Sequence, residues 1–339
     1  MKGKNGEKIM TKQIAVIPGD GVGPEVTKAA VSILQEMPAD LSFETYRAGD
    51  KELAQTGRAL PETTLSGAKN ADAVLLGAVG NSAVDVVIRL RQELDTFVNL
   101  RPIKSFSGVK CINSNTDLVI VRENTECLYS GIENELTDEV TTATRVITKK
   151  ASKRIAQYAF DYAKTKGYSK VTAIHKSNVL PVTGKKFVST VKEVAAKYDE
   201  TLKFDDLLVD ATAMYLVMDP ERFEVIVTTN LFGDILSDLA AGLIGGLGLS
   251  PSANIGDEHG LYEPVHGTAP DIAGKGIVNP AATILSAGHM LDFLSYKELA
   301  NALEKAVNES IAAGETTPDL GGKLSTMDMA NAVLERMKL

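Results

Sequence analysis

Two aspartates in the second half of the chain have the residue type and spacing of a metal site. Asp234 and Asp238 are four residues apart and follow the apolar run Phe223–Thr228. That run predicts a buried strand leading into a helix, and residues four apart lie on one helical face. Two neighbouring carboxylates repel each other unless a cation lies between them, and all-oxygen ligands suit Mg²⁺ or Mn²⁺. Asp210, which follows the apolar residues Leu207–Val209, is a candidate third ligand. The alternative is a solvated acidic face.

A cation and three apolar side chains recur at helical spacing before residue 96. Ser82 can cap a helix that runs to about Thr96. The residues expected on one face of it are Val84, Val87, Ile88 and Arg91. Such a face could bind a molecule with a carboxylate at one end and a branched alkyl group at the other. The alternative is that the apolar residues pack in the core while Arg91 reaches towards solvent.

Further polar residues stand beside or after predicted strands. Arg101 lies ten residues beyond Arg91, and Arg122 ends the apolar run Val119–Val121. Three arginines could clamp two carboxylates, although a single arginine is more often part of a surface ion pair. Tyr129 and Lys176 are candidate proton-transfer groups, because tyrosine can donate a proton and a buried lysine titrates readily. Either residue could equally be structural.

Composition excludes several classes of protein. The chain has 339 residues and a formal net charge of −8, without a Lys/Arg block, so nucleic acid is not an expected partner. The two cysteines and four histidines show no zinc-site spacing. No apolar run approaches a membrane span, and Met1–Lys12 does not read as a signal peptide. We therefore expect a cytoplasmic protein.

The order of elements predicts an α/β fold. Short apolar runs alternate with helical segments, which favours a largely parallel sheet. The first run leads into a glycine turn at Gly19–Gly23, but Pro24 and the glycine spacing do not fit a dinucleotide-binding loop. A tight turn packed against a neighbouring element is expected there instead. Val140–Ile147 predicts a strand that belongs either to a β-arm between subunits or to an edge hairpin.

Taken together, these motifs give the chain a family resemblance from Ile14 to Met337. It resembles the β-decarboxylating dehydrogenases of (R)-2-hydroxy acids, which include isopropylmalate, isocitrate, homoisocitrate and tartrate/malate dehydrogenases. The motifs that carry the resemblance are Ile17–Glu25, Leu90–Arg91, Asn99–Pro102, Val121–Glu126, His175–Val179, Val209–Ala211, Asn230–Asp238 and Glu263–Gly274.

The resemblance implies a two-domain α/β fold that is not a Rossmann fold. Residues 1–96 and 245–339 would form a cofactor-side domain, and residues 97–244 a domain for substrate, metal and dimerisation, with a β-arm at the dimer interface. It also implies a homodimer with shared active sites, to which Lys176 and Asp210 reach from the partner subunit. Arg91, Arg101 and Arg122 match the substrate arginines, Tyr129 and Lys176 the catalytic pair, and Asp210, Asp234 and Asp238 the Mg²⁺ or Mn²⁺ ligands.

The cofactor and the substrate follow from two further comparisons within the family. The cofactor loop matches at Glu263, His266, Gly267, Ala269, Asp271, Ile272 and Asn279. NADP-dependent isocitrate enzymes typically have lysine and tyrosine where this chain has Asp271 and Ile272, so NAD⁺ is expected. Bacterial isocitrate enzymes bind a third carboxylate with a Ser-x-Asn motif, where this chain offers Val87 and Ile88.

These differences predict 3-isopropylmalate as the substrate and leucine biosynthesis as the role. Homoisocitrate, isocitrate or malate/tartrate dehydrogenase is the alternative. A non-catalytic regulatory subunit is more remote, because every candidate catalytic and metal residue is present. Cys127 departs from the family pattern, since it stands where glycine is more usual; we expect activity that is sensitive to thiol oxidation.

Overall fold

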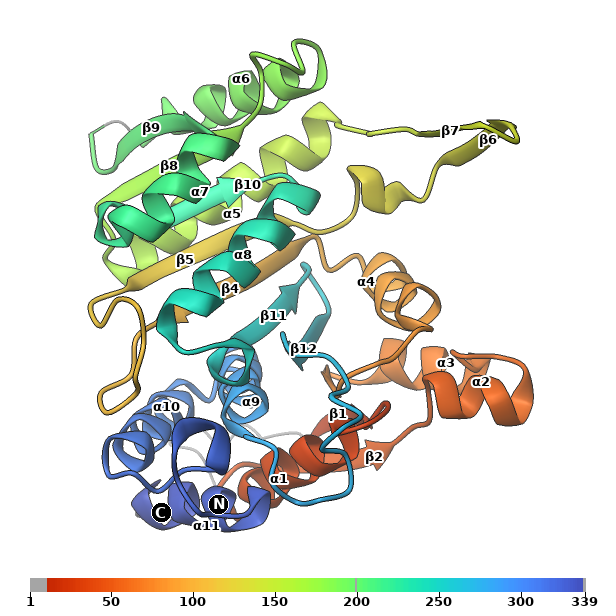
Figure 1. The fold of residues 1–339 in the computed structure, drawn as a ribbon, viewed down its shortest axis with the longest axis vertical. Helices are drawn as coiled ribbons and strands as arrows, with labels where there is room; N and C mark the ends of the chain where they lie inside the picture. The colour runs from red at the N-terminus through yellow and green to blue at the C-terminus, as the bar shows by residue number, and fades with distance from the viewer. Residues whose placement is uncertain (1–10, 199, 338–339) are drawn as a thin grey trace, which may run out of the picture.

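The computed structural model describes residues 11–198 and 200–337. A single mixed sheet of ten strands runs through the molecule (Figure 1). Its order is β2 (Leu41–Thr45), β1 (Lys12–Ile17), β3 (Ala73–Leu76), β12 (Gly260–Pro264), β11 (Pro251–Ile255), β4 (Val98–Lys104), β5 (Asp117–Glu123), β10 (Val225–Thr228), β8 (Lys170–His175) and β9 (Lys203–Leu208). The pairs β12–β11, β11–β4 and β4–β5 are antiparallel and the others parallel. The predicted α/β class with a mostly parallel sheet is confirmed.

The strands that were recognised in the sequence are the apolar ones. In β5, β10 and β8 the aliphatic residues are almost wholly buried, as expected for parallel strands covered on both faces. β4, β9, β11 and β12 were not predicted, because each mixes polar residues into a short run. β9 is an edge strand, and the other three carry buried polar side chains.

Helices pack on the sheet and on one another. α8 (Asn230–Ile244) crosses in front of β4 and β5 in Figure 1, and α5 (Lys149–Lys166) lies behind β5, β10 and β8. The remaining α-helices away from the segment 82–96 are α1 (Gly23–Glu36), α2 (Asp50–Thr56), α3 (Glu62–Asn70), α6 (Thr183–Ala195), α7 (Val209–Met218), α9 (Ala281–Phe293), α10 (Lys297–Ala312) and α11 (Thr326–Met337). The sequence pattern predicts helices at Lys297–Ala312 and Thr326–Met337, and α10 and α11 begin and end at these residues.

The glycine turn after β1 packs against its neighbours, as predicted. A Cβ on Gly19 would lie 2.1 Å from the carbonyl oxygen of Ala78, and one on Gly21 would lie 2.1 Å from that of Thr268. Both glycines also have positive φ angles. The turn therefore serves close packing between the N-terminal strand–helix unit and the loop that contains Thr268.

The segment 82–96 differs from its prediction. Val84–Ile88 forms a π-helical turn, η1, and only Arg89–Glu93 is α-helical, α4. Ser82 does not cap the helix with its side chain; its backbone N–H donates instead to Asp50 Oδ1 at 2.7 Å. Because the π turn changes the angular spacing, offsets of three, four and seven no longer define one face here.

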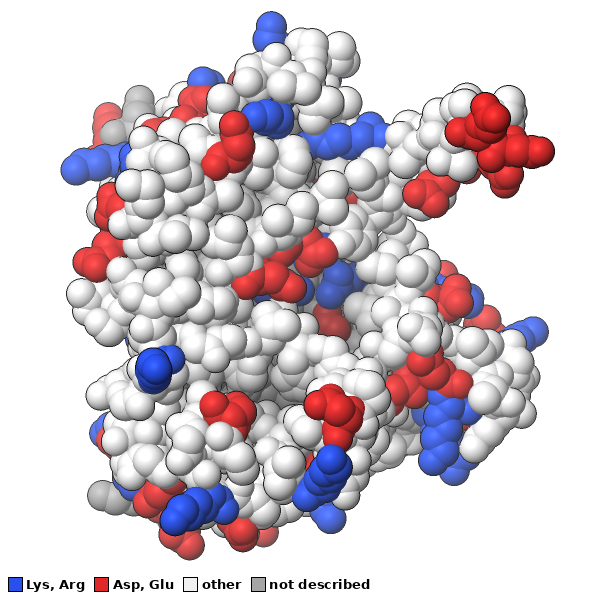
Figure 2. Space-filling view, viewed as in Figure 1, with Lys and Arg blue, Asp and Glu red and all other residues white. Residues whose placement is uncertain are grey.

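A two-stranded arm projects from the body (Figure 1). It consists of β6 (Glu133–Thr137) and β7 (Val140–Ala143), and all residues of both strands are exposed. The predicted strand at 140–147 is therefore correct in place but shorter. Acidic side chains gather at the tip of the arm (Figure 2).

The sheet order has a bearing on the predicted domains. Strands from residues 1–96 and 245–339 occupy one end of the sheet, and strands from 97–244 occupy the other, with β11 paired to β4 where they meet. The division into two domains stays a prediction. None of the helices that the structure describes has the length and apolar character needed to cross a membrane.

Candidate active site

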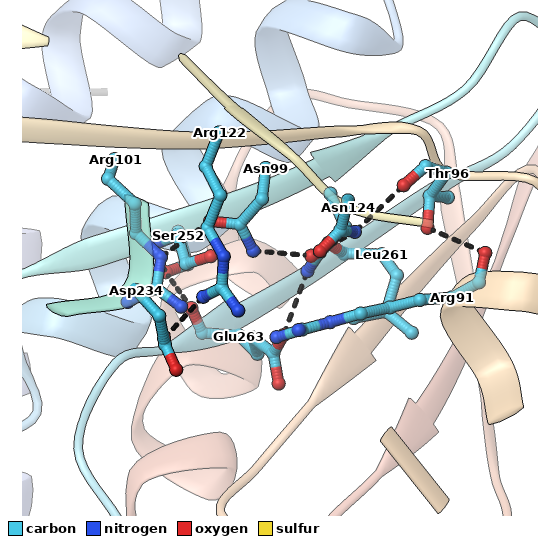
Figure 3. Close-up of polar contacts among 12 residues, drawn as sticks. Arg91, Thr96, Asn99, Arg101, Arg122, Asn124, Asp234, Ser252, Leu261 and Glu263 are labelled. Carbon is cyan, nitrogen blue, oxygen red and sulfur yellow. Dashed lines mark hydrogen bonds and ion pairs between the residues drawn. The ribbon is translucent and has the colours of Figure 1, made fainter. Parts of the chain in front are cut away.

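Three buried arginines converge at the centre of the sheet. Arg91 comes from α4, Arg101 from β4 and Arg122 from β5, and they are 7%, 5% and 1% exposed. The antiparallel pairing of β4 with β5 sets the relative positions of the latter two. Figure 3 shows the three guanidinium groups gathered around Asp234 and Glu263. The arginines predicted from the sequence are thus brought together.

The arginine cluster has hydrogen-bond donors without acceptors, although each arginine also faces a carboxylate. Arg101 Nη1 and Arg91 Nε are buried and have no hydrogen-bond partner among the described residues. Burial, together with the charges of Arg122 and Arg91, lowers the pKa of Arg101 to about 10. The Arg101 guanidinium therefore remains charged at neutral pH. An anion with several oxygen atoms would supply the missing acceptors and relieve the repulsion.

Arg122 is held firmly by the first turns of α8. Its Nε and Nη2 donate to Asn230 Oδ1 at 3.0 and 2.7 Å, and its Nη1 pairs with Asp234. Gly233 lets the helix approach, because a Cβ there would lie 2.6 Å from Arg122 Cγ. Asn230 was not singled out individually from the sequence, although it lies in the quoted motif beside Asp234.

The two aspartates of α8 differ in environment. Burial acts to raise the pKa of Asp234, but the charge of Arg122 and the hydrogen bond from Tyr129 outweigh it, so this pKa lies below its ordinary value. Desolvation raises the pKa of Asp238, and the neighbouring Asp234 adds to that effect. Arg101 Nη1 lies 3.9 Å from Asp238 Oδ1. A pair of carboxylates of this kind, with hard oxygen donors, fits a divalent cation.

Tyr129 lies directly beside these groups. Its hydroxyl donates to Asp234 Oδ2, and Arg122 packs over its ring at 5.0 Å. Burial raises the pKa of Tyr129, and the hydrogen bond to Asp234 adds to this against the opposing charge of Arg122. The phenol is therefore protonated at neutral pH and can act as a proton donor.

Lys176 and Asp210 form a separate pair. Lys176 follows β8, Asp210 lies in the first turn of α7, and Lys176 Nζ is 2.5 Å from Asp210 Oδ1. This contact lowers the pKa of the exposed Asp210 carboxyl. Within residues 11–198 and 200–337 of one chain, no three His, Cys, Asp or Glu side chains come together as a metal site. Asp210 thus does not join Asp234 and Asp238 within a protomer.

Three residues just before Arg91 were predicted to contact an alkyl group, namely Val84, Val87 and Ile88. Val87 and Ile88 are both half-buried, and Val87 packs against a core cluster. Val84 is 70% exposed, whereas Val86 is fully buried. The structure therefore leaves Val87 and Ile88 partly accessible near the arginine cluster, while Val84 projects into solvent.

The predicted cofactor loop follows β12 and packs on α1. Glu25 accepts hydrogen bonds from the backbone N–H groups of Gly274 and Gly276, at 2.5 and 2.8 Å. Burial lowers the pKa of His266, so its ring is neutral at physiological pH, and its Nε2 has no partner among the described residues. Of the other predicted cofactor residues in this loop, Gly267 and Asp271 are exposed, His266 is half-buried, and Ala269 and Ile272 are half-buried against an apolar cluster. Asn279 bonds to Asp319 and to the start of α9.

Glu263 has a role that sequence reasoning did not find. It was predicted as a cofactor residue, yet in the structure Arg91 Nη2 donates to its Oε1 at 2.6 Å, and both side chains are buried. Asn99 and Asn254, which were also not singled out, adjoin this pair. The available signal was the presence of amides and a carboxylate among the apolar residues of short strands.

Comparison with known proteins identifies the family of this chain. The sequence profile described as "Isocitrate/isopropylmalate dehydrogenase" matches residues 13–333. A 3-isopropylmalate dehydrogenase from Archaeoglobus fulgidus is 55% identical over 95% of this chain and 98% of its own length. A 3-isopropylmalate/3-methylmalate dehydrogenase from Methanocaldococcus jannaschii is 52% identical over 96% of this chain and 99% of its own.

A solved structure of a related protein has the same fold as this chain. The crystal structure of isocitrate dehydrogenase from Methylococcus capsulatus superposes with a TM-score of 0.93 at 44% identity, covering 97% of this chain and 100% of that chain. The expected fold is thereby confirmed. The chain belongs to the isocitrate/isopropylmalate dehydrogenase family.

Proposed function

We propose that this chain is an NAD- and divalent-metal-dependent 3-isopropylmalate dehydrogenase. It would oxidise (2R,3S)-3-isopropylmalate and release CO₂, giving 4-methyl-2-oxopentanoate for leucine biosynthesis in the cytoplasm. The observation that carries the proposal is the buried arginine cluster, with free donors, beside two carboxylates on α8. The names of the most similar relatives supply the substrate.

The arginine cluster fits a substrate with two carboxylates. Arg101 and Arg91 have buried N–H groups without acceptors, and Arg122 is fixed by Asn230. Bidentate contacts to both carboxylates would orient the substrate and satisfy these groups. Arg91 would keep its contact with Glu263 through Nη2 and offer its remaining N–H groups to the substrate.

Asp234 and Asp238 would hold Mg²⁺ or Mn²⁺, with Asp210 of the partner subunit as a further ligand. The donor set supports this, since carboxylate oxygens suit both ions. The cation, when bound, would supply Lewis-acid polarisation for oxidation and decarboxylation. Asp234 would release its contacts with Arg122 and Tyr129, which currently occupy both of its oxygens.

Tyr129 and Lys176 would transfer the two protons of the reaction, one to the substrate carbon and one from its hydroxyl group. Tyr129 is neutral and lies beside Asp234, which suits it to deliver a proton to the carbon from which CO₂ departs. Lys176, from the partner subunit, would help to remove the hydroxyl proton. Its pairing with Asp210 supports the idea that both groups serve one site.

NAD⁺ is the proposed oxidant. The exposed Asp271 carboxylate can accept hydrogen bonds from ribose hydroxyls and would repel a 2′-phosphate. The neutral His266 ring, with a free Nε2, offers a further contact to the nucleotide.

A homodimer would complete the site. Two exposed features support this assembly: the β6–β7 arm, with Leu136 and Val140 exposed, and the outer faces of α7 and α8. Met214, Met218 and Ile235 are 47%, 73% and 56% exposed there. An apolar surface of this kind is expected to be covered in an oligomer.

The decisive experiment is a substrate panel. The purified protein is given NAD⁺ and Mn²⁺ with 3-isopropylmalate, homoisocitrate, isocitrate, malate or tartrate, and kcat/KM is measured from NADH formation. We expect the highest kcat/KM with 3-isopropylmalate. Isocitrate is the second candidate, because the superposed structure is that of an isocitrate dehydrogenase. A preference for it would overturn the substrate assignment, and no activity with any acid would overturn the reaction.

A further inference from the structure

A chain of buried amides connects two of the substrate arginines. Asn254 Oδ1 accepts hydrogen bonds from Asn99 Nδ2 at 2.7 Å and from Asn124 Nδ2 at 3.0 Å. Its own Nδ2 donates to the Leu261 carbonyl oxygen at 3.0 Å and to Glu263 Oε1 at 2.8 Å. Asn254 and Asn99 are both 0% exposed. Figure 3 shows Asn99, Asn124 and Glu263 of this network between Arg101 and Arg91. The Asn254 amide thus uses two donors and two acceptor sites, which is its whole hydrogen-bonding capacity.

Both ends of this chain are arginines of the site. Asn99 Oδ1 accepts from Arg101 Nε at 2.6 Å, and Glu263 Oε1 accepts from Arg91 Nη2 at 2.6 Å. The connection therefore runs from Arg101 through Asn99, Asn254 and Glu263 to Arg91.

A branch of the same network makes hydrogen bonds to the backbone at Thr96 and Arg91. Asn124 Nδ2 also donates to the carbonyl oxygen of Thr96 at 2.8 Å, and Thr96 Oγ1 donates to the carbonyl oxygen of Arg91 at 3.2 Å. Asn254 is thus joined to Arg91 by two routes, one through the side chain of Glu263 and one through main-chain contacts.

The sheet register explains why Asn254 is the hub. On β11, Asn254 lies directly opposite Asn99 of β4 on one side and opposite Leu261 of β12 on the other. Asn99 in turn lies opposite Arg122 of β5. This antiparallel part of the sheet is also where strands from 97–244 meet strands from 245–339. One amide at this junction can set the spacing of groups on both sides.

We propose that Asn254 is a positioning residue, which fixes the distance between Arg91 and Arg101 so that one dicarboxylate can engage both. It is fully buried and acts through Asn99 and Glu263 without touching the substrate. The inference rests on the proposed function. Because Asn254 makes four hydrogen bonds that link the two arms of this network, removing its amide loosens both ends together.

The test measures binding of 3-isopropylmalate by calorimetry in the presence of Mn²⁺. Asn254→Leu removes all four hydrogen bonds, and we expect its Kd to rise by about tenfold or more, since one charge-assisted contact is worth that much. Thr64→Val is the matched control. Its hydroxyl is buried and donates to the Arg47 carbonyl oxygen at 2.7 Å, outside the hydrogen-bonded network of Asn254. It should keep the Kd of the wild type.

Asn254→Asp provides a second test with a pH readout, in case the leucine variant does not fold. The introduced carboxyl keeps the shape and the accepted hydrogen bonds, but it can donate to Glu263 only when protonated. The ratio of its Kd to the Kd of the wild type should therefore increase as the pH rises and decrease as the pH falls. A purely structural role would give no such recovery.

The outcomes separate this inference from the proposed function. If the wild type does not bind 3-isopropylmalate, the proposed function fails. If the wild type binds it and either folded Asn254 variant binds equally tightly at all pH values, the inference fails. Equal weakening by Thr64→Val would likewise overturn it.

Discussion

At Gly233, an added methyl group should favour the helix but crowd the side chain of Arg122, so substitution tests which effect is larger. Substitution of glycine by alanine inside an exposed helix usually stabilises it by about 1 kcal/mol. At Gly233 the added Cβ would lie 2.6 Å from Cγ and 2.7 Å from Cβ of Arg122, where contacts of 3.4–4 Å are ordinary. The arginine stem must therefore move by about 1 Å, and overpacking of this kind costs about 1–3 kcal/mol.

The stem has little freedom to yield. Arg122 is 1% exposed, and its guanidinium is held by Asn230 and Asp234. A displacement of this size at a substrate-positioning residue lowers the rate by about a hundredfold. We therefore expect Gly233→Ala to lose about two orders of magnitude in kcat/KM and to gain no stability.

Gly242 offers a control in the same helix. It is exposed, and a Cβ there would meet no atom within 4 Å. Gly242→Ala should raise the free energy of unfolding by about 1 kcal/mol. Steady-state kinetics and thermal unfolding of both variants check this. A Gly233→Ala enzyme with wild-type kcat/KM would refute the packing argument.

Three further predictions follow from separate parts of the chain. Val87→Asn should lower kcat/KM for 3-isopropylmalate by about tenfold through lost apolar contact; an unchanged value would mean that Val87 does not meet the alkyl group. Cys127 has a φ of +74°, which glycine adopts more readily than alanine. The free energy of unfolding of Cys127→Gly should therefore exceed that of Cys127→Ala by about 1 kcal/mol. The reverse order would show that the backbone is not strained. Burial acts to raise the pKa of Asp206, but Lys192 and His175 outweigh it and lower the pKa below its ordinary 3.8. Asp206→Asn should therefore lower the free energy of unfolding by about 1 kcal/mol above that pH, and the difference should vanish as pH falls through the folded-state pKa; a difference that persists in acid would contradict this.

The sequence was informative where one physical requirement dominates. Strands such as β10 are apolar and β-branched because both faces are buried, and α10 and α11 carry apolar residues at helical spacing. The residues near the carboxyl ends of these strands and the first turns of the next helices were therefore identifiable. Arg122 and Asp234 were found in this way, and the structure joins them directly.

Other features depend on three-dimensional context. β11 and β12 were not recognised because Asn254 and Glu263 interrupt their apolar pattern, and only the sheet register gives these residues partners. The π turn at Val84–Ile88 has no local signature in the sequence. Cys127 is 1% exposed, with Arg145 Nε donating to its sulfur at 3.4 Å, so its burial argues against the expected sensitivity to oxidation.

The most direct measurement is the metal dependence and stoichiometry of the reaction with 3-isopropylmalate. NADH and CO₂ are quantified together, with Mn²⁺ present and after removal of divalent cations by a chelator. We predict one CO₂ for each NADH, with both lost on chelation and restored by added Mn²⁺, and with neither formed by Asp234→Asn. NADH formation without CO₂, or turnover that survives chelation, would contradict the account.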